Sequence, residues 1–153
     1  MPNLTVGTIV MKDRATILIA KPYDGPDAGL WTIPDGLVNE GESIRNASIR
    51  SIKEETGLEV EPQMSLFLCE RIVENDHRIG YFVLASPINL EPNVEPVPVP
   101  GRRYAEVKWV DVRTLGDIQK NEGMSDFTAD AMVKLSNFLR GQAAAAPRSG
   151  MVN

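Results

Sequence analysis

The sequence predicts an α/β fold, a three-layer α/β/α sandwich with a mixed β-sheet. Two observations carry this prediction. Several short segments rich in β-branched residues alternate with loops, and only two segments, far apart in the chain, have helical periodicity. The length of 153 residues, with 42% apolar and 24% charged residues, suits one compact domain. We expect that domain to span residues 1–141 and residues 142–153 to form a disordered tail, because they lack an amphipathic pattern.

Six segments are predicted to be extended because they are short, rich in β-branched or apolar residues, and bounded by turn residues. They are residues 4–11, 15–20, 31–33, 65–70, 78–85 and 106–112. Pro34 ends the third segment before a turn at Gly36, and the fourth and fifth segments are expected to pair. Five prolines between Pro87 and Pro100 exclude a helix or a central strand there, so this segment is predicted to be a stiff loop.

The two helices have recognisable boundaries. Ser43 can cap a helix that runs to Thr56, and Gly57 suits the left-handed position after its end. The second helix begins near Ser125, and we expect Gly141 to end it. Its apolar positions repeat at helical spacing and are Phe127, Ala131, Met132, Leu135, Phe138 and Leu139.

Composition excludes several classes of function. A formal net charge of −5 without a long basic run argues against nucleic-acid binding. Cys69 is the only cysteine, so there is no intrachain disulfide and no cysteine-based zinc site. No apolar stretch reaches about 18 residues and no signal sequence opens the chain, so we expect a cytoplasmic protein that does not enter a membrane.

The most informative segment is residues 36–58, GLVNEGESIRNASIRSIKEETGL. It joins a glycine turn to a helix that carries two adjacent carboxylates, a combination suited to holding Mg²⁺ on a diphosphate. The segment resembles the Nudix box, the signature of hydrolases that cleave a nucleoside diphosphate linked to another moiety. The matching positions are Gly36, Glu42, Arg50, Ile52, Glu54, Glu55, Gly57 and Leu58. The chain departs from the family pattern at Ser51, where a glutamate is expected directly after the arginine.

The resemblance covers roughly residues 3–140 and implies the Nudix-type α/β/α sandwich. It also implies that Glu54 and Glu55 bind Mg²⁺, with Mn²⁺ as a substitute, and that the backbone carbonyl of Asp35 joins them. At about 100° per residue, positions 51, 54 and 55 share one face of the helix, so the serine removes one of three carboxylates from it. Arg50 has lost its usual neighbour and is expected to pair with Glu54 one turn on.

The missing carboxylate leaves the general base open. The serine hydroxyl cannot act as a base near pH 7. Glu106, on the last predicted strand before Trp109, is the first candidate for the catalytic base because family members often carry an acid at a similar place. Alternatively, water is activated without a dedicated protein base, at some loss of rate. The weaker carboxylate candidates are Glu70, Glu74, Asp76 and Glu95.

Substrate contacts are predicted on either side of the box. Arg102 and Arg103 end the proline-rich loop and could neutralise phosphates, although a solubilising pair on the surface is the alternative. Trp31, Tyr81 and Tyr104 are aromatic residues that could stack on a base.

Together these features predict a Mg²⁺-dependent, MutT-like pyrophosphohydrolase acting on a small nucleotide, with nucleoside triphosphates as the first expectation. Two alternatives stay open. One is a non-catalytic Nudix-fold module that binds a nucleotide, which Ser51 motivates. The other is a hydrolase of another diphosphate, such as ADP-ribose or a nucleotide sugar. Because Nudix domains often dimerise, a homodimer also remains open.

Overall fold

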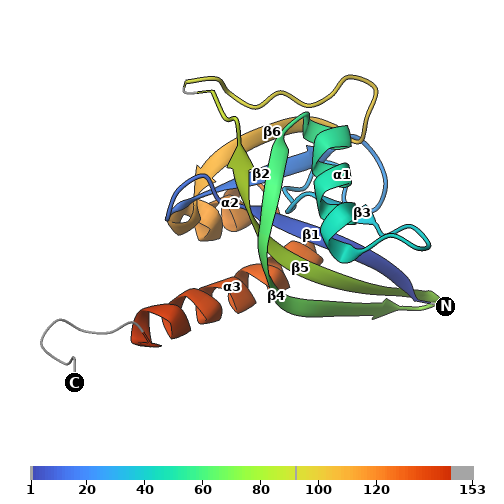
Figure 1. Ribbon diagram of the computed structural model, residues 1–153. Helices are drawn as coiled ribbons and strands as arrows, with labels where there is room; N and C mark the ends of the chain where they lie inside the picture. Colours follow the sequence, from blue (N-terminus) through green and yellow to red (C-terminus); the bar gives the residue numbers. More distant parts are fainter. Residues whose placement is uncertain (1, 92, 146–153) are drawn as a thin grey trace, which may run out of the picture.

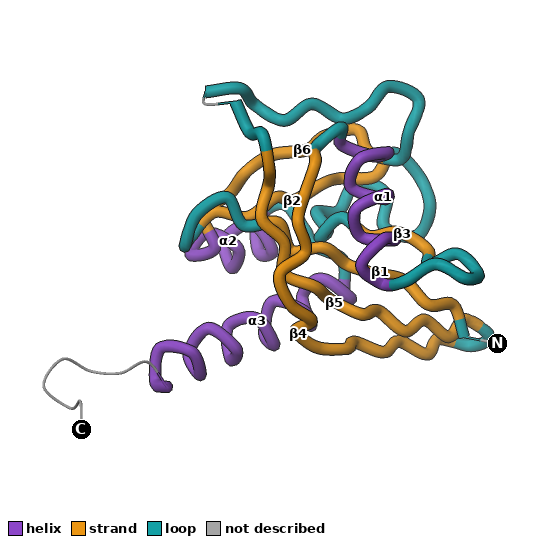
Figure 2. Tube along the Cα trace, in the orientation of Figure 1, coloured by secondary structure: helices purple, strands orange, loops and turns teal. Residues whose placement is uncertain are grey.

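The computed structural model describes residues 2–91 and 93–145 of the chain. Figure 1 shows the arrangement of the elements, and Figure 2 separates helices, strands and loops. The strands are β1 (Asn3–Val10), β2 (Thr16–Pro22), β3 (Asp35–Leu37), β4 (Glu59–Val73), β5 (Asp76–Ile88) and β6 (Tyr104–Asp111). The helices are α1 (Ile44–Thr56), α2 (Leu115–Asn121) and α3 (Asp126–Ala145), and a 3₁₀ turn (Val112–Thr114) precedes α2.

The main sheet is mixed, as the sequence predicts. Its strand order is β3-β1-β5-β4, in which β1 and β5 run parallel and the outer pairs are antiparallel. Strands β2 and β6 form a second, two-stranded antiparallel sheet. The β4–β5 hairpin contains a register shift between Pro62 and Met64, where the proline cannot donate a ladder hydrogen bond.

Alternate residues of β1 face two different layers. Val6 packs with Ala47 of α1, whereas Ile9 belongs to the cluster that contains Phe127 of α3. Helix α1 therefore covers one face of the sheet, and α2 and α3 lie on the other side (Figure 1). This arrangement is the three-layer α/β/α sandwich that the sequence predicts.

Most strand predictions are correct in place but not in length. The predicted pair 65–70 and 78–85 is observed as the much longer hairpin of β4 and β5. Residues 31–33 do not form a strand, although Trp31 and Thr32 make isolated bridges. Instead, the predicted turn at Gly36 is part of the short strand β3, which pairs with β1. Hydrogen bonding to the edge of β1 therefore overrides the local turn signal of this segment.

The boundaries of α1 are confirmed: the Ser43 hydroxyl accepts from the Asn46 amide at 3.0 Å, and Gly57 has φ 75°. The start of the last helix at Asp126 is confirmed as well, but α2 was not predicted. The expectation that Gly141 ends the last helix is wrong, because α3 continues to Ala145. The helix tolerates one glycine because residues 142–145, Gln-Ala-Ala-Ala, are strong helix formers.

The predicted boundary between domain and tail at residue 141 thus falls within α3, and residues 146–153 lie outside the described residues. The separation of domain and tail stays a prediction. Among the helices that the structure describes, none is long and apolar enough to cross a membrane.

Candidate metal and substrate site

Three positions of helix α1 that the sequence places on one face differ in their burial. Ser51 and Glu55, four positions apart, lie on the inner side of the helix with exposed fractions of 4% and 8%. The side chain of Glu54 lies at the margin and is 42% exposed. The helical geometry predicted for positions 51, 54 and 55 therefore gives one buried carboxylate, one accessible carboxylate and one buried hydroxyl.

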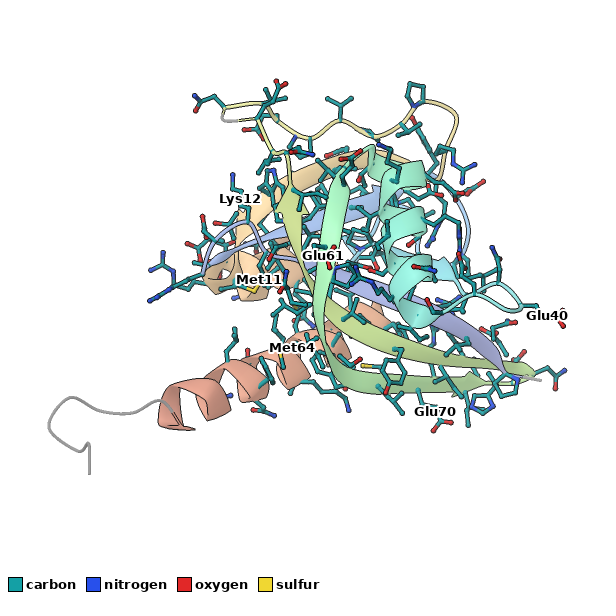
Figure 3. All side chains as sticks on the ribbon, viewed as in Figure 1. Met11, Lys12, Glu40, Glu61, Met64 and Glu70 are labelled. Carbon is teal, nitrogen blue, oxygen red and sulfur yellow. The ribbon has the colours of Figure 1, made fainter. Side chains whose placement is uncertain are left out.

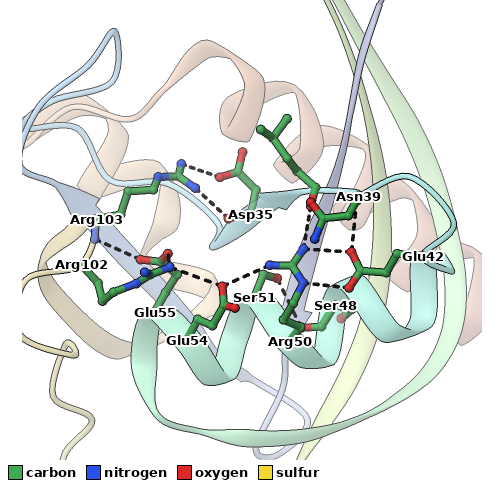
Figure 4. A network of polar contacts seen from close by, with 11 residues as sticks. Asp35, Asn39, Glu42, Ser48, Arg50, Ser51, Glu54, Glu55, Arg102 and Arg103 are labelled. Atoms are coloured by element: carbon green, nitrogen blue, oxygen red, sulfur yellow. Dashed lines mark hydrogen bonds and ion pairs between the residues drawn. The ribbon is translucent and has the colours of Figure 1, made fainter.

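Arg50 ties the box loop to the helix (Figure 4). Its guanidinium donates to both carboxylate oxygens of Glu42, at 2.7 and 2.9 Å, and to the Leu37 carbonyl at 2.8 Å. The expected pair with Glu54 is present at 3.1 Å. The hydrogen bonds from Arg50 hold the pKa of the Glu42 carboxyl below its usual range. Such a two-point contact fixes geometry, so both residues position the loop.

Not every acid near the box takes part in this network. Glu40 lies at the tip of the loop that leads into α1 and points away from the body of the molecule (Figure 3). Glu42 and Glu40 are separated by a single glycine, yet only Glu42 faces the helix.

The proline-rich loop returns to the C-terminal end of α1. The Val99 amide donates to the Glu55 carbonyl at 3.2 Å, which places the next residues beside the carboxylates. Arg102 then donates to Glu54 at 3.3 Å and to Glu55 at 3.0 Å, and the Arg103 amide donates to the second Glu55 oxygen at 3.0 Å. The stiff loop therefore brings two arginines to the acidic pair from a segment nearly fifty residues away in sequence.

The Arg103 side chain continues the network to β3. It donates to the Asp35 carbonyl at 2.8 Å and to the Asp35 carboxylate at 2.6 Å. Burial alone would lower the pKa of Arg103, but the charge and hydrogen bond of Asp35, together with the nearby Tyr104 and Glu55, outweigh burial and the pKa is raised. The Asp35 amide in turn donates to the hydroxyl of the buried Tyr104 at 3.1 Å, and burial raises the pKa of that phenol.

Strand β3 approaches α1 at Gly36 without room for a side chain. A Cβ atom added at Gly36 would lie 2.6 Å from the Cβ of Ser51. The Ser51 hydroxyl donates only to the Ser48 carbonyl, at 3.3 Å, so it faces the turn and its own helix. The small residue at position 51 and the glycine at position 36 are therefore matched by direct contact.

The oxygen atoms of this site suit a hard divalent cation. The carboxylates of Glu54 and Glu55 both accept from Arg102, and the Asp35 carbonyl accepts from Arg103, so all three already point toward positive charge. Carboxylate and carbonyl oxygens are the ligands that Mg²⁺ takes in proteins. Within residues 2–91 and 93–145, however, no three His, Cys, Asp or Glu side chains are grouped closely enough to hold a metal. The predicted set of two carboxylates and one backbone carbonyl at Asp35 stays a prediction.

Among the described residues, no hydrogen bond or ion pair connects Glu106 to this site. It is exposed and pairs in register with Lys21 of β2. Its neighbour Val107 belongs to the buried cluster that contains Ile52 of α1, so strand alternation turns Glu106 to the opposite face. The role of Glu106 as catalytic base at Glu54 and Glu55 therefore stays a prediction.

Trp31 is a core residue with an exposed fraction of 1%. Its indole nitrogen donates to Glu122 at 3.2 Å, and the Lys21 and Lys108 ammonium groups lie 4.5 and 4.3 Å from the ring centre. With its ring covered in this way, Trp31 offers no free face for the predicted stacking on a base. Tyr104 is equally buried and acts through its hydroxyl group.

The sequence interpretation missed one group in the site, the side chain of Asp35, which it assigned only a carbonyl role. The signal was present, because the family's Pro-Gly-Gly is Pro34-Asp35-Gly36 here. The aspartate holds Arg103, and with Arg103 it lines a cavity that includes Arg78. No local pattern could have placed Arg78 there, because it comes from β5.

Known proteins resemble this chain in sequence and in fold. The family model of the NUDIX domain matches residues 1–131. The chain is 38% identical over 94 residues to Nudix hydrolase 2 of Arabidopsis thaliana. This match covers 59% of this chain and 34% of that protein. It is 42% identical over 57 residues to the ADP-ribose pyrophosphatase of Methanocaldococcus jannaschii. This match covers 37% of this chain and 33% of that protein. The chain therefore covers only about a third of the length of either relative.

Among solved structures, a MutT NUDIX hydrolase from Burkholderia pseudomallei superposes with a TM-score of 0.72 at 24% identity, over 88% of this chain and 98% of that one. This likeness concerns the fold. Since the domain match covers most of the sequence and includes every element that builds the site, the chain belongs to the Nudix family.

Proposed function

We propose that this protein hydrolyses the diphosphate linkage of a nucleoside diphosphate attached to another moiety. The observation that carries the proposal is the meeting of the Glu54–Glu55 pair with Arg102 and Arg103, beside the box turn. A site that combines two carboxylates with two arginines can accommodate both a divalent cation and the phosphate oxygens that it neutralises.

Nudix hydrolases generally use divalent metal ions, and we propose Mg²⁺ here, with Mn²⁺ as a substitute. Glu54, Glu55 and the Asp35 carbonyl would hold it. A metal ion bound there supplies charge neutralisation of the phosphates and lowers the pKa of coordinated water. The protein's own groups do the remaining work: Arg102 and Arg103 orient the phosphates, and the contact between Arg50 and Glu42 keeps the box loop against α1.

For the substrate we propose a nucleoside triphosphate-type compound, in line with the fold that the chain shares with a MutT NUDIX hydrolase. ADP-ribose is the second candidate, favoured by the 42% identity of the box region to the ADP-ribose pyrophosphatase named above. We further propose a cytoplasmic site of action, because both candidates are nucleotides of that compartment.

The test is release of phosphate, diphosphate or nucleoside monophosphate from a panel of nucleoside triphosphates, ADP-ribose and nucleotide sugars, with Mg²⁺ or Mn²⁺. We expect wild-type protein to need the metal and Glu55→Gln to lose at least about a hundredfold in kcat, because the change removes a charge without changing shape. The matched control is Glu61→Gln, an exposed glutamate that pairs with Arg45 away from the site, and it should retain full activity.

Circular dichroism and the melting temperature check that Glu55→Gln stays folded. Full activity of Glu55→Gln would contradict the proposed metal site. Absence of turnover on every substrate, together with metal-dependent nucleotide binding, would instead identify the binding module that the serine at position 51 motivates.

A further inference from the structure

A cavity of about 340 Å³ opens beside Asp35, at the end of the site remote from α1. Strand alternation explains its position, because Gly36 faces Ser51 of α1 and its neighbours Asp35 and Leu37 therefore face the other way. The lining includes Asn3, Thr5, Asp35, Leu37, Arg78 and Arg103.

Three adjacent strands build the floor of this cavity. Thr5 of β1 is in register with Leu37 of β3, and Asn3 of β1 is in register with Arg78 of β5. Residues in register on neighbouring strands share a face of the sheet, so these side chains project into the same space. The floor is thus fixed by sheet hydrogen bonds, while Arg103 reaches over it from the proline-rich loop.

Arg103 joins the cavity to the acidic site. Its amide contacts Glu55, and its guanidinium contacts Asp35 at the mouth of the cavity. A substrate whose diphosphate lies at Glu54 and Glu55 would therefore extend past Arg103 into this space.

Arg78 is the cation of the cavity that has no described partner. Its guanidinium carbon lies 5.9 Å from the centre of the Phe127 ring, which supports it from below. Of the carboxylates in residues 2–91 and 93–141, none forms an ion pair with it, although Asp76 lies two residues before it on the same strand. Directly opposite Arg78 across the hairpin stands a second arginine, Arg71. Two like charges at paired positions repel each other, and an anion bound between or beside them would weaken that repulsion.

The charges of the lining leave a positive surplus. Asp35 is neutralised by Arg103 at 2.6 Å, so Arg78 remains as an unmatched charge in a protein whose formal net charge is −5. Most of the lining residues carry polar or charged groups, and Leu37 is the one large apolar residue among them. A phosphate bound in this cavity would find the guanidinium of Arg78 together with the side-chain amide of Asn3, whereas the Thr5 hydroxyl already donates to the Ile79 carbonyl at 3.4 Å.

We propose that this cavity binds a further phosphate group of the substrate, beyond the two that form the cleaved linkage, and that Arg78 recognises it. The inference rests on the proposed function and deepens it, because it assigns the substrate to compounds with at least three phosphates. The third phosphate is either the terminal group of a triphosphate or a monoester on a sugar.

The experiment compares three pairs of compounds that differ by one phosphate, in Mg²⁺: ATP with ADP, ADP-ribose 2′-phosphate with ADP-ribose, and inorganic triphosphate with inorganic diphosphate. The measured quantity is the preference for the richer compound, as a ratio of kcat/KM, or of Kd from calorimetry for compounds that are not turned over. We expect Arg78→Gln to reduce this preference about tenfold or more for at least one pair, as the loss of a charge-assisted hydrogen bond predicts. Arg78→Lys should restore part of it, because the lysine keeps the charge but not the planar fork.

The control is Arg14→Gln, an exposed arginine in the turn after the other end of β1, which should leave every ratio unchanged. A ratio within one protein is insensitive to the amount of folded enzyme, so partial unfolding of a variant cannot imitate the effect. The affected pair tells whether the phosphate is terminal or a monoester. Unchanged ratios for all three pairs in Arg78→Gln would overturn the inference even if Glu55-dependent turnover were found. An Arg78-dependent preference in Kd without any turnover would support it and would overturn only the proposed hydrolysis.

Discussion

Ser51 is the residue at which this chain departs most clearly from its family, and the structure explains how the departure is accommodated. The backbone at Gly36 rests on the serine, so the turn lies closer to α1 than a longer side chain at position 51 would allow. The serine therefore alters both the charge of the site and the spacing between turn and helix.

We predict that Ser51→Glu lowers the free energy of unfolding by about 1–3 kcal/mol in metal-free buffer, because three added heavy atoms must displace the turn. The third carboxylate should also strengthen Mg²⁺ binding, so the loss should shrink as Mg²⁺ is added. Urea denaturation with and without Mg²⁺ measures both effects.

Ser51→Ala is the matched control and should stay close to wild type, since the hydroxyl makes only one long hydrogen bond within its helix. If Ser51→Glu bound Mg²⁺ no better than wild type, position 51 would not face the metal site.

Arg102 occupies the oxygens that we assign to the metal. It pairs with Glu54 and Glu55 while its own side chain remains 45% exposed, so water screens the interaction and its contribution is modest. We predict that Arg102→Gln lowers the Mg²⁺ concentration for half-maximal binding several-fold, because a competing cation is removed. The KM for the nucleotide should rise in the same variant, because a phosphate contact is lost.

Metal titration by calorimetry and steady-state kinetics separate the two effects. Arg113→Gln is the control, since Arg113 pairs with Asp111 on the 3₁₀ turn before α2. Weaker Mg²⁺ binding in Arg102→Gln would show that the arginine supports the metal site instead of competing for it.

At the scale of elements, the seating of α3 on the sheet depends on a glycine in β5. A Cβ added at Gly80 would lie 2.3 Å from two ring atoms of Phe127, near the start of α3. The same ring lies 5.9 Å from the guanidinium carbon of Arg78, so this contact also supports a side chain of the cavity proposed to bind phosphate.

We predict that Gly80→Ala destabilises the protein by about 1–3 kcal/mol, because the ring must move within a packed core. Chemical denaturation measures the loss. The control is Gly116→Ala in α2, where nothing lies within 4 Å of the new atom and the helix should gain stability or stay unchanged. Equal stability of Gly80→Ala and wild type would mean that Phe127 does not pack on β5 as described.

At the scale of the whole molecule, the single thiol reports on cooperative unfolding. Cys69 is 1% exposed in the core between the sheet and α3, and burial, followed by a hydrogen bond with Asp130, raises its pKa to about 12. A thiol in this state is neither a ready nucleophile nor accessible to reagents.

We therefore predict that Cys69 reacts with a disulfide reagent at pH 8 only through unfolding. The logarithm of the labelling rate of Cys69 should rise linearly with urea concentration, and its slope should equal the urea dependence of the free energy of global unfolding. Unfolded protein should react at the rate of a free thiol. Fast labelling that is independent of urea would show that β4 opens locally, and the hairpin would then be a separate unit of stability.

How much of the protein was predictable differs between elements and contacts. Both boundaries of helix α1 were predictable because Ser43 and Gly57 act on neighbouring backbone groups. The short α2 and the continuation of α3 past Gly141 were not, because packing against the sheet and the following alanines decide them. The catalytic role of Glu106 stays a prediction, because the face that its side chain takes depends on the pairing of β2 with β6 and not on a local pattern.

The sequence by itself determined the family, the acidic pair Glu54–Glu55 and the loss of a carboxylate at position 51, because these depend on spacing along one helix. Only the tertiary structure decided which cations meet that pair. Arg102 and Arg103 are brought there by the return of a proline-rich loop, and Arg78 is placed across the cavity by the register of β1 with β5. Such contacts join residues that are distant in sequence, and they arise from how strands and loops are assembled, which no local pattern encodes.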